Sequence, residues 1–177
     1  TVEAMQKEVC PFKGCLYFGL MLTPDGPKVI EYNCRFGDPE TQVVLPLLES
    51  DLLKIMLATT NGALDKTEVR FSAGAAACVI LASGGYPLAY EKGKEITGLV
   101  NGQLPGSDAI VYHAGTAVQD GRLVTAGGRV LGVTATAADL PAALEKAYAA
   151  ADSIHFDKLH RRSDIGARAL AALKARE

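Results

Sequence analysis

The sequence predicts an α+β fold, in which antiparallel strands plus helices come first and a small, mostly antiparallel β domain with C-terminal helices follows. Two observations carry this prediction. Short apolar runs alternate with Gly, Pro, Asn and Asp turn signals in both parts, and the helical patterns between them carry recognisable caps. The polar stretch 65–70 separates the two parts. We therefore expect a first domain over residues 1–64 and a second over residues 65–177.

The first part begins with a predicted amphipathic helix in residues 1–9 and continues with a β-hairpin over residues 14–36. Pro24-Asp25-Gly26 supplies the turn between the two apolar runs of the hairpin. Asp38 is placed as an N-cap and Pro39 as the first helical residue of a helix to Leu48, which Pro46 interrupts. A further helix over residues 51–59 closes at Asn61-Gly62.

The second part is expected to be mostly antiparallel sheet. Strands are predicted near residues 73–82, 109–114, 115–119, 122–126 and 129–135. A tight turn over Gln119-Asp120-Gly121-Arg122 joins two of them into a hairpin. Asp139 is expected to cap a helix that runs to about Asp152, and a last amphipathic helix fills residues 167–174.

Composition and charge exclude several classes of function. Eighteen basic against twenty acidic residues leave no excess positive field for a nucleic-acid backbone, so nucleic acid is not an expected partner. The longest apolar stretch, residues 73–82, has about half of the ~20 residues that span a bilayer, so no membrane segment is expected. The four cysteines show no paired metal-ligand spacing, which favours a reducing, cytoplasmic setting.

The second strand of the predicted hairpin carries the main candidate site. Side chains alternate between the two faces of a strand, so Glu31, Asn33 and Arg35 are expected on the face opposite to the apolar one. A carboxylate and an amide carbonyl two residues apart offer adjacent hard oxygens that suit Mg²⁺. The arginine fork can then bind phosphate oxygens beside the metal. The alternative is a surface strand with a solvated polar face.

The residues after this strand favour the site. Gly37 permits an unusual backbone turn, and the free N–H groups of a helix that starts at Asp38-Pro39 would face the same region. A strand, a glycine turn and a helix start are therefore expected to converge on one place.

The same residues resemble the motif of the glycinamide ribonucleotide synthetases, a family of ATP-grasp ligases that are also called phosphoribosylamine-glycine ligases. The motif here is Glu31-Tyr32-Asn33-Cys34-Arg35-Phe36-Gly37-Asp38-Pro39-Glu40-Thr41-Gln42. The resemblance extends over nearly the whole chain, through Ala82-Ser83-Gly84-Gly85-Tyr86-Pro87, Lys92-Gly93-Lys94-Glu95-Ile96-Thr97-Gly98, His113-Ala114-Gly115-Thr116 and Gly127-Gly128-Arg129-Val130-Leu131.

The resemblance implies a reaction and a set of roles. ATP would activate glycine as glycyl phosphate, and 5-phosphoribosylamine would then attack to give glycinamide ribonucleotide, ADP and phosphate, an early step of purine synthesis. Glu31 and Asn33 would be ligands of Mg²⁺ (or Mn²⁺) at the ATP phosphates. Arg35 would be the catalytic residue beside the reacting phosphoryl group, and Asp38 would lie near the substrate. Residues 1–64 would end the ATP-grasp C-lobe, and residues 65–177 would form the C-terminal domain of the synthetase.

A pair of arginines before the last predicted helix is a second candidate. A sugar phosphate is a natural guest for Arg161-Arg162, and a solvated loop is the alternative. The family pattern aligns here with Arg162, whereas Ser163 departs from it. Arg162 is accordingly expected to contact the 5′-phosphate of the substrate.

The resemblance also implies that part of the enzyme lies elsewhere. The lysines and the glycine-rich loop with which ATP-grasp enzymes hold ATP would precede Thr1, which is not an initiator methionine. We therefore expect the C-terminal portion of a longer enzyme, inactive alone, whose missing N-terminal domains complete the site.

Two other interpretations are open. A biotin carboxylase shares the Glu-x-Asn-x-Arg core, but the run Phe36-Gly37-Asp38-Pro39-Glu40 argues against it. A non-catalytic module of the biotinyl type would also be small, antiparallel and glycine-rich. In this sequence, however, no lysine is flanked by methionines as an attachment site would be.

Overall fold

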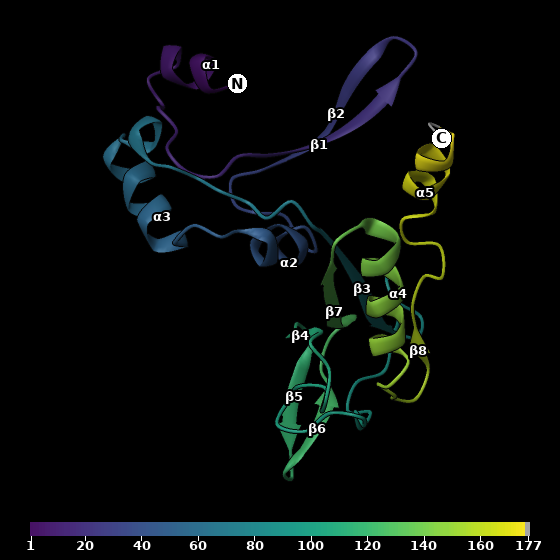
Figure 1. The fold of residues 1–177 in the computed structure, drawn as a ribbon. Coiled ribbons are helices and arrows are strands. Elements are labelled where there is room, and N and C mark those ends of the chain that lie inside the picture. The colour runs from purple at the N-terminus through teal and green to yellow at the C-terminus, as the bar shows by residue number, and fades with distance from the viewer. Residues whose placement is uncertain (176–177) are drawn as a thin grey trace. The chain divides into compact units, whose positions relative to one another are not determined.

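The structure is a computed structural model that describes residues 1–175. The chain forms two compact units, which are described separately (Figure 1). The first comprises Thr1–Thr41 and Leu48–Ser72, and the second comprises Gln42–Leu47 and the chain from Ala73 onward. Among the described residues, no helix is both long and apolar enough to cross a lipid bilayer.

The first unit contains the predicted hairpin. Helix α1 (Val2–Lys7) precedes strands β1 (Tyr17–Thr23) and β2 (Gly26–Asn33), which pair antiparallel. The hairpin is confirmed, but β2 ends at Asn33 and not at Phe36. The reason lies in the partner strand, because β1 begins at Tyr17, which is paired with Asn33. Residues 34–36 therefore have no ladder partner in β1, and the chain bends at 34–35.

The helix predicted to start at Pro39 begins later. Residues 38–40 form a turn, and helix α2 spans Thr41–Val44. The Gly37 carbonyl accepts hydrogen bonds from both the backbone N–H and the hydroxyl of Thr41, so the chain turns before it becomes helical. Asp38 is therefore not the N-cap of this helix. The interruption at Pro46 is confirmed, since α2 passes into the short 3₁₀ helix η1 (Leu45–Leu47).

The remaining helices of the first unit follow their local signals. Helix α3 (Leu52–Asn61) is capped by Asp51, whose carboxylate accepts a hydrogen bond from the Lys54 N–H at 3.1 Å. Gly62 ends the helix in the left-handed conformation at φ +68°, which costs glycine little because it has no Cβ. A 3₁₀ turn, η2 (Leu64–Lys66), follows.

The second unit is built on an antiparallel sheet of four strands in the order β4-β7-β3-β8. Its strands are β3 (Ala75–Ser83), β4 (Ile110–His113), β7 (Arg129–Ala137) and β8 (Leu159–His160). A separate hairpin joins β5 (Thr116–Gln119) to β6 (Arg122–Thr125). Asp120 and Gly121 both have positive φ in its turn, as the sequence pattern predicted.

Helix α4 (Leu140–Ala151) covers one face of this sheet, against β3 and β7 (Figure 1). Its cap is confirmed, because the Asp139 carboxylate accepts a hydrogen bond from the Ala142 N–H at 2.9 Å. Small side chains on the buried stripe of α4 let the helix lie close to the sheet. The last helix, α5 (Ala167–Lys174), has the predicted bounds. The most deeply buried residues of the core are Val79, Leu81, Val130, Leu131, Val133, Ala143, Ala147 and Ile154.

The two compact units do not follow the predicted boundary between residues 64 and 65. Residues 48 and 71 form a β-bridge, and the Glu49 N–H donates to the Arg70 carbonyl, so the segment to Ser72 belongs with the first unit. Residues 42–47 group with the second unit because η1 lies against β3. Both features arise from contacts between segments far apart in the sequence.

Candidate active site

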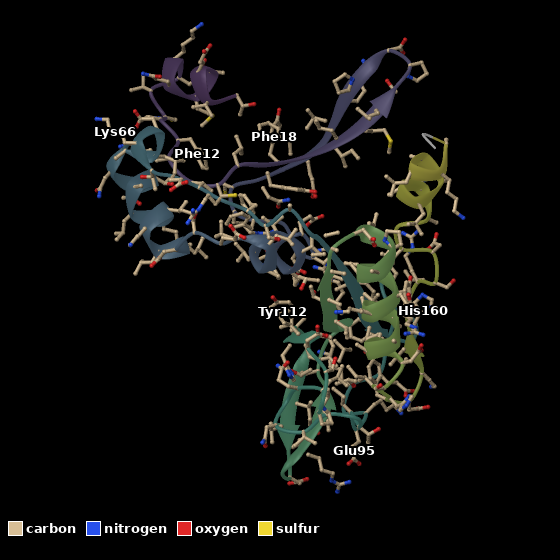
Figure 2. The ribbon with its side chains drawn as sticks, viewed as in Figure 1. Phe12, Phe18, Lys66, Glu95, Tyr112 and His160 are labelled. Atoms are coloured by element: carbon tan, nitrogen blue, oxygen red, sulfur yellow. The ribbon has the colours of Figure 1, made fainter. Side chains whose placement is uncertain are left out.

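The polar face of the hairpin gathers the residues that the sequence singled out first. In the antiparallel ladder Tyr17 is opposite Asn33, and Gly19 is opposite Glu31. Paired residues point to the same side of a two-stranded ladder, so these four residues share one face. On the other face the rings of Phe18 and Tyr32 meet edge to face with centroids 5.0 Å apart. Phe18 is labelled on the hairpin in Figure 2.

Gly19 makes room for the Glu31 side chain. A Cβ atom at residue 19 would lie 2.9 Å from Glu31 Cγ, closer than real Cβ contacts. The carboxylate-bearing chain therefore lies across the glycine, whose missing side chain leaves the space. Glu31 and Asn33 remain two residues apart on the same strand face, as the alternation predicted.

Glu40 joins this region, although the sequence patterns assigned it no role. The Tyr17 hydroxyl donates a hydrogen bond to Glu40 Oε1 at 3.1 Å. This bond is the main cause that raises the pKa of Tyr17, followed by burial and by the negative charges of Glu40 and Glu31. Both carboxylates thus lie near the Tyr17 phenol. In the sequence, the signal that could have singled out Glu40 is its position in the motif over residues 31–42.

Arg35 does not share the strand geometry of Glu31 and Asn33. It follows the end of β2, in the bend at residues 34–35. Its side chain is exposed, and its guanidinium donates to the Phe36 carbonyl at 2.7 Å. The expectation that alternation alone places Arg35 on the same strand face is therefore wrong, since the ladder stops two residues earlier. Its role beside a phosphoryl group stays a prediction.

Asp38 lies in the turn over residues 38–40. It precedes α2 by three residues, so its carboxylate is not the helix cap that the sequence suggested. The proximity of Asp38 to a substrate therefore needs support other than helix capping, and it also stays a prediction.

The donor set fits a hard divalent cation. Glu31 and Asn33 offer a carboxylate and an amide oxygen on one face, next to the free space over Gly19. Within residues 1–175 no group of three or more His, Cys, Asp or Glu side chains is arranged to hold a metal ion. The described residues therefore offer two candidate ligands, Glu31 and Asn33. Two protein ligands suit Mg²⁺, because this ion commonly takes its other ligands from phosphates and water.

The loop before α5 holds the second candidate. Arg162 binds the Asp164 carboxylate through two hydrogen bonds, Nε to Oδ1 at 2.8 Å and Nη2 to Oδ2 at 2.7 Å. This pairing raises the pKa of Arg162 and lowers the pKa of Asp164. The guanidinium is thus held in one orientation, beside a cavity of about 470 Å³ that Arg168 also lines.

Tyr148 fixes this loop to α4, which no sequence pattern indicated. Its hydroxyl donates to the Arg162 carbonyl at 2.9 Å and accepts from the Ile165 N–H at 3.1 Å. The Arg161 guanidinium lies over the Tyr148 ring, 5.4 Å from its centroid, and forms an ion pair with Asp152. Tyr148 therefore holds the loop both through its hydroxyl and through its ring.

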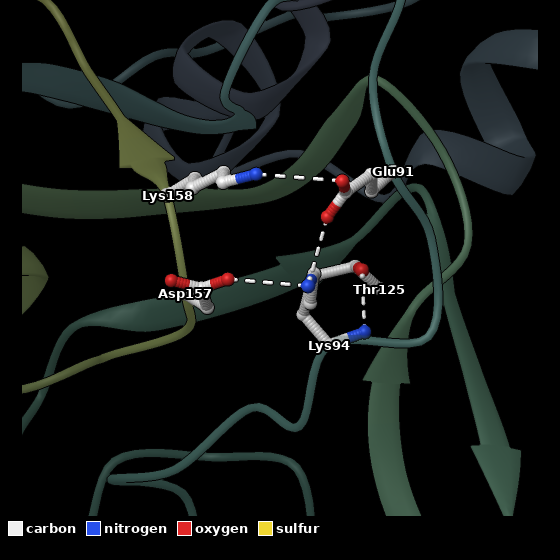
Figure 3. Close-up of polar contacts among 5 residues, drawn as sticks. All are labelled: Glu91, Lys94, Thr125, Asp157 and Lys158. Atoms are coloured by element: carbon white, nitrogen blue, oxygen red, sulfur yellow. Dashed lines mark hydrogen bonds and ion pairs between the residues drawn. The ribbon is translucent and has the colours of Figure 1, made fainter.

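A further polar cluster lies in the second unit, where Lys94 Nζ is 2.8 Å from Glu91 Oε2 and 3.1 Å from Asp157 Oδ2 (Figure 3). Lys158 Nζ reaches the other oxygen of Glu91 at 3.4 Å. Hydrogen bonds from the two lysines, Lys94 first, lower the pKa of Glu91. Lys94 is half-buried, whereas its partners are exposed. The charges satisfy one another, so the cluster serves to tie neighbouring loops together.

Comparison with known proteins matches both parts of the chain. Residues 1–41 match the family described as phosphoribosylglycinamide synthetase, ATP-grasp (A) domain. Residues 76–168 match phosphoribosylglycinamide synthetase, C domain. These two matches describe an ATP-grasp segment followed by a synthetase C domain. The chain belongs to the phosphoribosylglycinamide synthetase family, and this decides against the biotin carboxylase and biotinyl-module interpretations.

Named relatives agree with this family. The phosphoribosylamine–glycine ligase of Synechocystis sp. is 47% identical over 172 residues, which are 96% of this chain and 41% of that protein. The trifunctional purine biosynthetic protein adenosine-3 of Gallus gallus is 52% identical over 174 residues, 98% of this chain and 17% of that protein. The crystal structure of the Thermotoga maritima phosphoribosylamine–glycine ligase has a TM-score of 0.78 at 40% identity, and the match covers 92% of this chain and 39% of that one. The chain thus spans about two fifths or less of the length of these relatives.

Proposed function

We propose that this chain supplies the metal- and phosphate-handling edge, together with the C domain, of a phosphoribosylamine–glycine ligase. The observation that carries the proposal is the placement of Glu31 and Asn33 on one face of β2, opposite Tyr17 and Gly19. Family membership, through the matches to residues 1–41 and 76–168, supplies the reaction.

In this reaction a glycine carboxylate oxygen would attack the γ-phosphorus of ATP, and ADP would leave. The nitrogen of 5-phosphoribosylamine would then attack the acyl carbon of glycyl phosphate, lose a proton and release phosphate. Neither step needs a nucleophilic side chain. The protein's task is to position the reactants and to stabilise the negative charge that the phosphoryl group carries.

The residues of the hairpin suit that task. Glu31 and Asn33 would hold Mg²⁺ or Mn²⁺, which would supply charge neutralisation at the ATP phosphates. Arg35, exposed in the bend after β2, would bind the transferring phosphoryl group once its bond to the Phe36 carbonyl is exchanged. Asp38 would lie near the substrate. The other ligands and the adenine pocket would come from the portion of the relatives that this chain does not span.

The Arg162 loop would bind the 5′-phosphate of the amine substrate. Support comes from the fixed guanidinium and from the second cation, Arg168, on the same 470 Å³ cavity. Asp164 neutralises part of this charge and keeps Arg162 oriented between turnovers. A phosphate would bind there in addition to Asp164 or in exchange for it.

The test uses the complete ligase with the double variant Glu31→Ala and Asn33→Ala. Ligation that depends on Mg²⁺ should be lost, and titration of Mn²⁺ in the presence of ADP should show weakened metal binding. The control is Glu3→Ala with Gln6→Ala, which likewise removes one carboxylate and one carboxamide, on the exposed helix α1. Full turnover and full Mn²⁺ affinity in the hairpin double variant would refute the metal assignment.

A further inference from the structure

Glu40 carries a fixed negative charge that the assigned roles do not use. Oε1 accepts the Tyr17 hydrogen bond at 3.1 Å, and Oε2 lies over Gly37, where a Cβ atom would be 2.1 Å away. The side chain is half-buried. Tyr17 is the hydrogen-bond donor to this carboxylate. A partly desolvated carboxylate of this kind is favoured by a cationic partner.

The position of this charge is set by the metal-binding face. Tyr17 is paired with Asn33 in the ladder, and its phenol reaches Glu40 from that side of the hairpin. The charges of Glu40 and Glu31 both act on the Tyr17 hydroxyl, as the raised pKa of this tyrosine indicates. The hairpin thus presents a metal-type pair of oxygens and, next to it, a carboxylate held by a neutral donor.

The small size of glycine fixes where its binding groups must lie. Its carboxylate has to reach the phosphoryl group beside the metal, and its ammonium group is attached only one carbon farther on. The counter-charge that recognises the ammonium must therefore lie next to the metal ligands, and a carboxylate provides a charge-assisted hydrogen bond for it. Glu40 lies in the turn over residues 38–40, and the Tyr17 hydroxyl of β1 binds its carboxylate. It therefore meets this condition without sharing the strand face of Glu31 and Asn33.

We propose that Glu40 receives the ammonium group of the amino-acid substrate and that Tyr17 is a positioning residue that orients this carboxylate. The inference rests on the proposed ligase function and adds to it the recognition of one substrate. Gly37 belongs to the same arrangement, because any side chain there would displace the Glu40 carboxylate.

The experiment is calorimetric titration of glycine into the complete ligase, in the presence of Mg²⁺ and an ATP analogue with a methylene bridge between its β- and γ-phosphates. Glu40→Gln should weaken glycine binding by about tenfold to a hundredfold, the usual value of a hydrogen bond to a charged group. Glu40→Asp, which keeps the charge, should lie between Glu40→Gln and wild type. Tyr17→Phe should raise the KM for glycine more than it lowers kcat. Glu3→Gln on α1 is the matched control and should bind glycine as wild type does.

The Mn²⁺ affinity of the same variants separates recognition from metal binding. Glu31→Gln should weaken Mn²⁺ binding, whereas Glu40→Gln should leave it unchanged. Equal loss of Mn²⁺ affinity in both variants would make Glu40 a metal ligand and overturn the proposal, as would unchanged glycine affinity in Glu40→Gln. Failure of the proposed function is distinguishable, because the wild-type enzyme would then form no glycinamide ribonucleotide at all. Circular dichroism and thermal melting verify that each variant is folded, and Tyr17→Phe tests the inference should Glu40→Gln not fold.

Discussion

Gly19 faces Glu31 across the hairpin so closely that a Cβ atom at residue 19 would lie 2.9 Å from Glu31 Cγ. The contact is with the middle of the glutamate chain and not with its flexible end, so a methyl group there has to move the carboxylate. The absent side chain at residue 19 is thus part of the face on which we propose that a metal ion binds.

Gly19→Ala should accordingly weaken metal binding while leaving the hairpin folded, since alanine is tolerated in a strand at least as well as glycine. In the complete ligase we expect the half-saturating concentration of Mg²⁺ to rise at least about fivefold, equivalent to ~1 kcal/mol of binding energy. Steady-state rates over a Mg²⁺ series at saturating ATP measure this. A curve that superimposes on that of the wild type would show that Glu31 acts from another position.

Tyr148→Phe removes one hydroxyl that holds the Arg162 loop at two points, the Arg162 carbonyl and the Ile165 N–H. Loss of both bonds should destabilise the loop by about 1–2 kcal/mol. The KM for 5-phosphoribosylamine should rise and the KM for glycine should not. Tyr112→Phe, which removes the same group from strand β4, is the matched control. Parallel changes in both KM values would argue against a phosphate-binding role for this loop.

Asp139→Ala removes the cap of α4, whose first turn then has an unsatisfied N–H at Ala142. We expect a loss of about 1 kcal/mol in the free energy of unfolding, the usual value for such a cap. Urea denaturation followed by circular dichroism measures the change. Glu145→Ala, on the exposed side of the same helix, is the control and should shift the midpoint little. Equal shifts in the two variants would indicate that the cap contributes no specific stability.

The sequence patterns that predicted the structure correctly are those that involve only a few adjacent residues. Asp139 before α4, Gly62 after α3 and the Asp120-Gly121 turn each act on the backbone within four positions, so their effect is visible in the sequence. The same holds for the alternation that placed Glu31 and Asn33 together.

The predictions that were wrong or missing concern contacts whose position depends on a segment far away in the sequence. β2 stops at Asn33 because its partner strand starts at Tyr17, and that start removed Arg35 from the strand face. Glu40 and Tyr17 are 23 residues apart, so no local pattern could show that one donates to the other. Contacts between such distant residues depend on how the whole unit folds.

Stability of the second unit should depend on acid pH through Glu91, whose pKa is lowered by hydrogen bonds from Lys94 and Lys158. A carboxylate with a lowered folded pKa contributes stability that is fully present above its ordinary pKa of 4.5 and is lost as the pH falls through the lowered value. The urea midpoint of the wild type should therefore exceed that of Glu91→Gln at pH 6, and the two should converge under more acidic conditions. Because the charges are exposed, added salt should reduce the difference at pH 6. A constant difference across the acid range would contradict this linkage.

Nucleotide binding tests how much of the site these 177 residues hold. The hairpin offers two metal ligands, and among residues 1–175 no larger cluster of His, Cys, Asp or Glu is arranged for a metal. Calorimetric titration of Mg–ATP into the 177-residue chain should therefore show a Kd no tighter than about 1 mM, an affinity of only ~4 kcal/mol. The complete ligase is the positive control, and circular dichroism verifies that the shorter chain is folded. Micromolar affinity in the shorter chain would place most of the nucleotide site within these residues, and the search for its adenine and phosphate contacts would then turn to them.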